Sequence, residues 1–223
     1  MAQTGRTSSE KLARIPSGRV SLEGSLTVPD GAGGVVLFAH GSGSSRLSPR
    51  NRQVASSLNR EGLATLLIDL LTVEEEGVDI LTGHLRFDIE LLAGRLVSAT
   101  DWLLSQPQTR ELEIGYFGAS TGAAAALVAA TLRPAAVKAI VSRGGRPDLA
   151  GSYLSRVRAP TLLIVGGNDM PVIGMNREAL IQLSTEKALE VVPGATHLFE
   201  EPGALEEVSR LAARWFQKRL GRE

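Results

Sequence analysis

Residues 114–126 constrain the fold of this chain more than any other part of its sequence. The stretch reads Ile-Gly-Tyr-Phe-Gly-Ala-Ser-Thr-Gly followed by four alanines, so a G-x-S-x-G pattern joins an apolar run to an alanine-rich run. The apolar run predicts a buried strand and the alanines predict a helix. Because Gly118 and Gly122 lack a Cβ, the strand and the helix can meet in a very tight turn that exposes the hydroxyl of Ser120.

Segments typical of strands and of helices alternate along almost the whole chain. Short apolar runs predict buried strands at residues 35–39, 63–71, 112–117, 137–142, 161–165 and 188–192. Helical spacing predicts helices at residues 49–60, 87–104 and 204–219, besides the one after the glycine-flanked serine. Residues 18–28 alternate apolar and polar side chains, which indicates an antiparallel edge hairpin or a bent strand. The alternation predicts the α/β class, with a mostly parallel, doubly wound sheet flanked by helices.

The length of 223 residues fits one domain. We expect this domain to span residues 18–223, after a flexible leader formed by residues 1–17. The polar stretch at residues 72–83, which contains Glu74, Glu75 and Glu76, is expected to be a loop. Two interpretations remain open for it, a mobile loop beside the functional site and a solvated acidic turn.

The composition excludes several classes of function. The chain has 24 basic and 24 acidic side chains, so no overall field attracts nucleic acid or anionic lipid. It has no cysteine, which excludes disulfides, thiolate metal sites and a cysteine nucleophile. Residues 1–16 lack the apolar centre of a secretory signal, and no run has the length of a membrane span. We therefore expect a cytoplasmic protein without a nucleic-acid or membrane partner; the sequence does not indicate its oligomeric state.

A serine hydroxyl needs a base to become a nucleophile, and that base needs an acceptor that fixes its tautomer. Of the three histidines, His197 follows the last predicted strand and so should reach the same sheet edge as Ser120. Asp169 follows the preceding strand in a tight Gly-Gly-Asn-Asp turn, and the chain order Ser120, Asp169, His197 is the order typical of this chemistry on an α/β sheet. Asp148 is the alternative acid, since it follows a neighbouring strand.

An oxyanion that develops on the substrate needs donors that are already in place, and backbone amides meet this need. The motif predicts one donor from Thr121, the residue after the nucleophile, and one from the loop after an earlier strand. That loop reads His40-Gly41-Ser42-Gly43. We take Ser42 as the second donor, although Gly41 and Gly43 remain open.

Together, the loop at residues 40–43, the motif at residues 118–122, Asp169 and His197 resemble the dienelactone-hydrolase-like family of the α/β-hydrolase superfamily, over nearly the whole chain from residue 20. The resemblance implies an α/β-hydrolase fold and cleavage of a small-molecule ester or lactone through an acyl-enzyme, with no metal and no organic cofactor. The family's dienelactone hydrolases proper use cysteine where this chain has Ser120. No segment between the predicted strands is long enough for a large cap domain, so an open site is expected.

Arg143, after the strand that follows the Ser120 helix, could bind an acidic substrate group, and Arg146 could do the same. Alternatively, both are solvated or pair with Asp148.

Two other functions compete with hydrolysis. A nucleotide-binding module is suggested by Gly41-Ser42-Gly43 and by Asp69 at the end of the next strand, although Arg46 occupies the position of the third glycine. The other is a hydrolase fold that has become a binding protein without activity.

Overall fold

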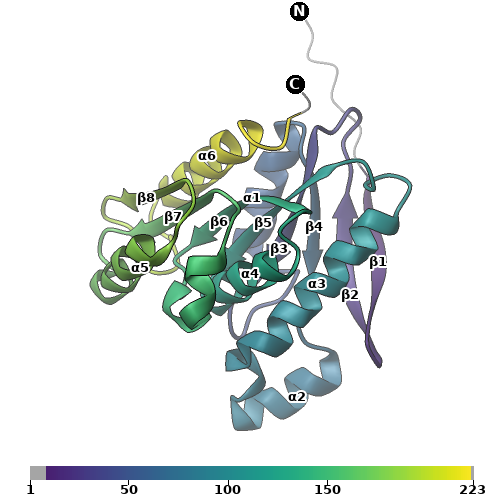
Figure 1. The fold of residues 1–223 in the computed structure, drawn as a ribbon, viewed down its shortest axis with the longest axis horizontal. Coiled ribbons are helices and arrows are strands. Elements are labelled where there is room, and N and C mark those ends of the chain that lie inside the picture. The colour runs from purple at the N-terminus through teal and green to yellow at the C-terminus, as the bar shows by residue number, and fades with distance from the viewer. Residues whose placement is uncertain (1–8, 222–223) are drawn as a thin grey trace, which may run out of the picture.

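The computed structural model describes residues 9–221, and they form one eight-stranded sheet with helices on both faces (Figure 1). The strand order is β1-β2-β4-β3-β5-β6-β7-β8. Strand β2 runs antiparallel to β1 and β4, and all neighbouring pairs from β4 to β8 are parallel. The strands are β1 (Glu10–Ser17), β2 (Val20–Thr27), β3 (Gly34–Ala39), β4 (Ala64–Ile68), β5 (Glu113–Ala119), β6 (Val137–Arg143), β7 (Thr161–Gly166) and β8 (Lys187–Val192). The predicted α/β class, with a mostly parallel doubly wound sheet, is confirmed.

The helices are divided between the two faces of the sheet. They are α1 (Pro49–Arg60), α2 (Val73–Thr82), α3 (Ile89–Ser105), α4 (Thr121–Leu132), α5 (Met170–Gln182) and α6 (Ala204–Gln217), with short 3-10 segments at Leu85–Phe87 and Pro147–Arg156. Helices α1 and α6 pack on the face that contains Phe38 and Phe117, whereas α3 and α4 pack on the face that contains Leu37 and Tyr116. No separate cap domain interrupts this arrangement in the described part of the chain (Figure 1).

The amino-terminal part of the chain differs from the expected flexible leader. Residues 10–17 form strand β1, which pairs along its whole length with β2 and turns into it at Gly18, where φ is +60°. Ala13 and Ile15 are buried under α3 and anchor the strand. Residues 1–8 of the expected leader lie outside the described residues. The prediction of an antiparallel pairing for residues 18–28 was correct, but the edge of the sheet is β1.

The polar stretch that was expected to be a loop is helix α2. Thr72 and Glu75 form a reciprocal capping box, in which the Thr72 hydroxyl accepts the Glu75 N–H and the Glu75 carboxylate accepts the Thr72 N–H. Gly83, in the left-handed conformation, ends the helix. Since Ile80 and Leu81 are exposed, apolar periodicity could not have revealed this helix. None of the helices in residues 9–221 combines the length and the apolar composition that crossing a membrane requires.

Candidate active site

Ser120 lies in the tight turn between β5 and α4, as the sequence predicted. Its φ of 49° and ψ of −122° are unusual for a residue with a side chain and cost about 1–3 kcal/mol of strain. The flanking glycines are required because any larger residue would collide with the backbone. A Cβ on Gly118 would lie 2.4 Å from the Cα of Ala123, and one on Gly122 would lie 2.3 Å from the carbonyl oxygen of Ala39. The turn therefore holds the half-buried Ser120 at the carboxyl end of the parallel strands.

Asp169 and His197 are brought together from two different loops. Asp169 follows β7 and His197 follows β8, and Nδ1 of His197 lies 2.7 Å from Oδ2 of Asp169. The side chain of Asp169 is 12% exposed and that of His197 is 40% exposed, so the imidazole is held on one side and open on the other. If Nδ1–H donates to the carboxylate, Nε2 keeps its lone pair, which is the tautomer that a general base needs. The loop is anchored by Phe199, which is buried and has a φ of 57°.

The end of β6 connects the serine to the histidine. The N–H of Ser120 donates to the carbonyl oxygen of Arg143 at 3.4 Å. The next residue, Gly144, has a φ of +50°, and a Cβ built on it would lie 3.6 Å from Cε1 of His197. Ser120 and His197 are therefore both close to the segment formed by Arg143 and Gly144.

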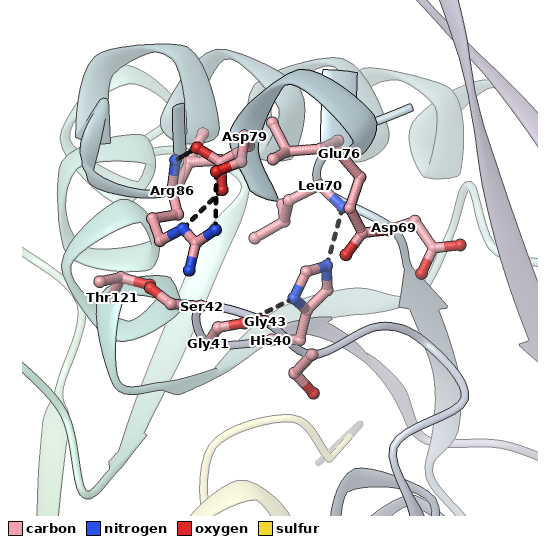
Figure 2. Close-up of a pocket in the computed structure, with 13 residues that line it drawn as sticks. His40, Gly41, Ser42, Gly43, Asp69, Leu70, Glu76, Asp79, Arg86 and Thr121 are labelled. Carbon is pink, nitrogen blue, oxygen red and sulfur yellow. Dashed lines mark hydrogen bonds and ion pairs between the residues drawn. The ribbon is translucent and has the colours of Figure 1, made fainter. Parts of the chain in front are cut away.

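The loop after β3 lies against the Ser120 turn, and Figure 2 shows Ser42 of this loop beside Thr121. A Cβ on Gly41 would lie 2.9 Å from the Cβ of Ser120, and the hydroxyls of Ser42 and Thr121 lie 3.1 Å apart. Thr121 is the first residue of α4, so its N–H has no acceptor within the helix. The residues expected to supply the two oxyanion donors are therefore neighbours beside Ser120.

His40 fastens this loop to the end of β4. Its Nε2 accepts the N–H of Leu70 at 3.0 Å, which places the proton on Nδ1, and Nδ1–H donates to the carbonyl oxygen of Gly41 at 2.9 Å. Burial lowers the pKa of His40 and favours this neutral form. The role of His40 is therefore structural, in agreement with the sequence-based preference for His197 as the base.

A cavity opens beside the loop after β3 and is covered by α2 (Figure 2). Its lining comprises the loop residues 40–44, Asp69 to Leu71, Glu76, Asp79, Arg86, Leu92 and Thr121. The contributions of Glu76, Asp79 and Arg86 were missed from the sequence. Arg86 is held by Asp79, with Nε 2.6 Å from Oδ2 and Nη2 2.8 Å from the carbonyl oxygen. The Thr-x-x-Glu pattern at residues 72–75 could have indicated that a helix begins there, but not that it covers the cavity.

The alternative site residues are engaged elsewhere. Asp148 accepts two hydrogen bonds from Arg146, at 2.9 and 2.7 Å, whereas Asp169 is the acid that contacts His197. Asp69, the candidate ribose-binding acid, is bound by the backbone and the guanidinium of Arg46. Within residues 9–221, no group of three or more histidine, aspartate or glutamate side chains is arranged to hold a metal ion.

Arg143, which was expected to meet an acidic substrate group, has a buried side chain that is 7% exposed. It is the last residue of β6 and lies two positions after Val141, on the face covered by α1 and α6. Like Ser120 and His197, it is not among the residues that line the cavity. Burial and the nearby Arg50 lower the pKa of Arg143 to about 10.

Comparisons with known proteins agree with this geometry. The model of the dienelactone hydrolase family matches residues 22–220. The crystal structure of dienelactone hydrolase from Anabaena variabilis is 63% identical, with a TM-score of 0.94 over 96% of this chain and 99% of that chain. Carboxyl esterase 2 from the fungus Tuber melanosporum is 18% identical, with a TM-score of 0.73 over 98% of this chain and 89% of that chain, which shows the fold alone.

A putative phosphoribosyl transferase from Mycobacterium tuberculosis is 58% identical over 203 residues, which are 91% of this chain and 45% of that protein. The chain thus spans about half the length of the curated mycobacterial relatives that it matches at 58% identity. Because the family model covers nearly the whole chain and the Anabaena structure matches 96% of it, the chain belongs to the dienelactone hydrolase family of α/β hydrolases, which confirms the family predicted from the sequence.

Proposed function

We propose that this protein hydrolyses small carboxylic esters or lactones through an acyl-enzyme formed on Ser120. The observation that carries the proposal is the contact of 2.7 Å between Asp169 and His197, at the sheet edge where a strained turn presents Ser120. A structural histidine would not need a carboxylate on one nitrogen and solvent on the other side of its ring. The half-exposed ring of His197 suits a base that exchanges protons with substrate.

The mechanism assigns one step to each residue. Nε2 of His197 removes the hydroxyl proton as Oγ of Ser120 attacks the carbonyl carbon, and Asp169 stabilises the imidazolium that forms. His197 then gives the proton to the departing alcohol, which leaves an acyl group on Ser120. Water attacks this ester with His197 again as the base, and the acid is released.

The amides of Thr121 and Ser42 stabilise the oxyanion in both steps. Three observations support this assignment of the amides. Thr121 begins α4, the loop that contains Ser42 lies against the Ser120 turn, and the hydroxyls of Ser42 and Thr121 are in hydrogen-bond contact. Because folding fixes these amides before substrate binds, they stabilise developing charge without reorganisation. Their position beside the cavity also directs the acyl group toward α2.

The cavity beside the loop after β3 combines apolar and charged groups. Leu70, Leu71 and Leu92 supply apolar contact, and Glu76, Asp79 and Arg86 supply charges. The longer mycobacterial relative is named a putative phosphoribosyl transferase. We further propose that this transfer activity belongs to the part of that protein outside the match, because the match spans 45% of it and this chain belongs to the dienelactone hydrolase family.

The test combines turnover and labelling. Ser120→Ala is expected to lower the hydrolysis of short p-nitrophenyl esters by at least about 10³-fold and to abolish labelling by a fluorophosphonate. The exposed Ser155 provides a matched control, and Ser155→Ala should change neither result. Near-normal turnover in Ser120→Ala would refute the proposal.

An unlabelled wild-type protein would instead indicate a binding protein without activity. A panel of p-nitrophenyl esters with acyl chains of increasing length then defines the acyl specificity. Turnover of 5-phosphoribosyl diphosphate by this chain would refute the assignment of transferase activity to the other part of the relative. Calorimetric binding of a dinucleotide would favour the nucleotide-binding alternative.

A further inference from the structure

Arg143 is a buried cation without a partner among the described residues. Its side chain is 7% exposed, yet neither Nε nor Nη1 has a hydrogen-bond partner in residues 9–221. The charged group that most affects it is Arg50, which has the same sign. Other buried or half-buried arginines in this protein do have carboxylate partners; Arg95, for example, binds Glu75. Arg143 therefore differs from the rest and needs an explanation.

The side chain lies on the face of the sheet opposite the cavity of Figure 2. Arg143 pairs in register with Ala119 on β5 and Ile164 on β7, so it is central in the sheet. The next inward residue on its face, Val141, packs in the cluster formed with α1 and α6, whereas the cavity reaches Leu92 of α3, on the other face. At 7% exposure under these elements, Arg143 cannot serve as the contact for an acyl group in that cavity.

A second positive group lies nearby, at the beginning of α1. Arg50 is the second residue of this 12-residue helix, and its Nη1 donates to Glu200 at 2.8 Å. Its Nε is buried and, like two nitrogens of Arg143, has no partner among the described residues. The amino-terminal end of a helix adds a partial positive charge. Within residues 9–221, Glu200, whose side chain is 61% exposed, is the one carboxylate that forms an ion pair with either guanidinium.

This excess of positive charge cannot be removed by proton loss, because a guanidinium with a pKa of about 10 remains charged at neutral pH. A buried charge is costly unless an opposite charge accompanies it. Water could fill the hydrogen bonds but would leave the charge uncompensated. We propose that the guanidinium groups of Arg143 and Arg50, beside the amino-terminal end of α1, bind a small inorganic anion, such as chloride, behind the Ser120 turn. Because the Ser120 N–H donates to the backbone of Arg143, the anion stabilises the part of the sheet that carries the turn.

Thermal unfolding in chloride tests the proposal. At constant ionic strength, replacing sodium gluconate by sodium chloride should raise the wild-type Tm by about 4 °C, with saturation. Arg143→Met should lose the saturable rise. Arg133→Met is the control, because Arg133 forms an exposed ion pair with Asp101 on the surface, and it should keep the wild-type response. An equal Tm in both salts, or an unchanged response in Arg143→Met, would overturn the proposal.

A second measurement covers the case in which Arg143→Met does not fold. Crystals of the wild-type protein grown in bromide should show an anomalous peak within hydrogen-bond distance of the Arg143 guanidinium, and the absence of a peak there would also overturn the proposal. Arg50→Met should raise the chloride concentration needed for half of the Tm rise by about tenfold, the equivalent of one lost charged hydrogen bond. None of these measurements depends on ester hydrolysis, so they succeed or fail independently of the function proposed for Ser120.

Discussion

Replacing Gly41 by alanine tests whether the loop after β3 supplies an oxyanion donor. The new Cβ would lie 2.9 Å from the Cβ of Ser120 and 3.2 Å from the carbonyl oxygen of Ala119. Carbon atoms in contact normally lie about 3.5–4.0 Å apart, so the loop must withdraw by about 0.6–1 Å. Gly41 is not among the glycines with a positive φ, so alanine adds no backbone strain and the effect comes from this contact.

A withdrawal of that size moves the Ser42 amide out of range of the oxyanion. Donors act at about 2.7–3.1 Å from the developing charge, and removing one typically lowers kcat by about 10²–10³-fold. We therefore expect Gly41→Ala to lose about 10²-fold in kcat with p-nitrophenyl acetate and to keep its KM, because the oxyanion exists only in the transition state. Urea unfolding should show that the variant remains folded.

Gly77 offers a matched control on the helix that covers the same cavity. An alanine Cβ there meets nothing within 4 Å, and alanine in a helix interior stabilises by about 0.5–1 kcal/mol relative to glycine. Gly77→Ala should therefore keep its activity and gain stability. If Gly41→Ala keeps the wild-type kcat while Gly77→Ala behaves as expected, the loop does not donate to the oxyanion.

Two further predictions concern the acid and the buried histidine. Asp169→Asn should lower kcat by about 10³–10⁴-fold with little change in Tm, since His197 loses the acceptor that fixes its tautomer; unchanged turnover would show that another acid serves His197. The pKa of His40 is lowered from its ordinary value of 6.5, so the unfolded chain takes up this proton at a higher pH than the folded protein. The contribution of neutral His40 to the free energy of unfolding is thus complete above pH about 6.5 and declines as the pH falls, by up to about 1.4 kcal/mol per pH unit. Urea unfolding at pH 7.5 and 5.5 should show this decline in the wild type and in His84→Gln but not in His40→Gln; the same decline in His40→Gln would assign it to other groups.

The parts of the fold and site that could be predicted depend on local sequence. Central strands such as β3 and β7 are buried on both faces and therefore read as continuous apolar runs. The Ser120 turn needs glycines at fixed positions because backbone atoms of neighbouring segments lie within 2.4 Å of any added Cβ. Once the sheet is parallel, its topology brings the ends of β5, β7 and β8 to one edge, so chain order alone predicted that Asp169 and His197 would be near Ser120.

The parts that were missed depend on distant contacts. Strand β1 buries only Ala13, Ile15 and Ser17, and its outward residues Glu10 and Arg14 make it resemble a polar leader. It becomes a strand because β2 offers a free edge, which no feature within residues 10–17 reveals. Helix α2 likewise lacks an apolar face toward the core, and Asp79 is its only buried residue. It is held by polar contacts, so its Thr-x-x-Glu cap was the one local signal.

The difference between local sequence and distant contacts also explains why Arg143 was expected to bind an acidic substrate group. Arg143 was expected to follow the strand at residues 137–142, whereas it is the last residue of β6 and its carbonyl oxygen accepts the Ser120 N–H. The period of two along a strand also places Arg143 on the side of Val141 and opposite Ser142. That pattern does not tell which side opens to substrate, because the open side is defined by α2 and the loop after β3, far away in sequence. The sequence of a strand therefore tells which residues share a face. Which of the two faces is open to substrate becomes known only when the positions of α2 and of the loop after β3 are known.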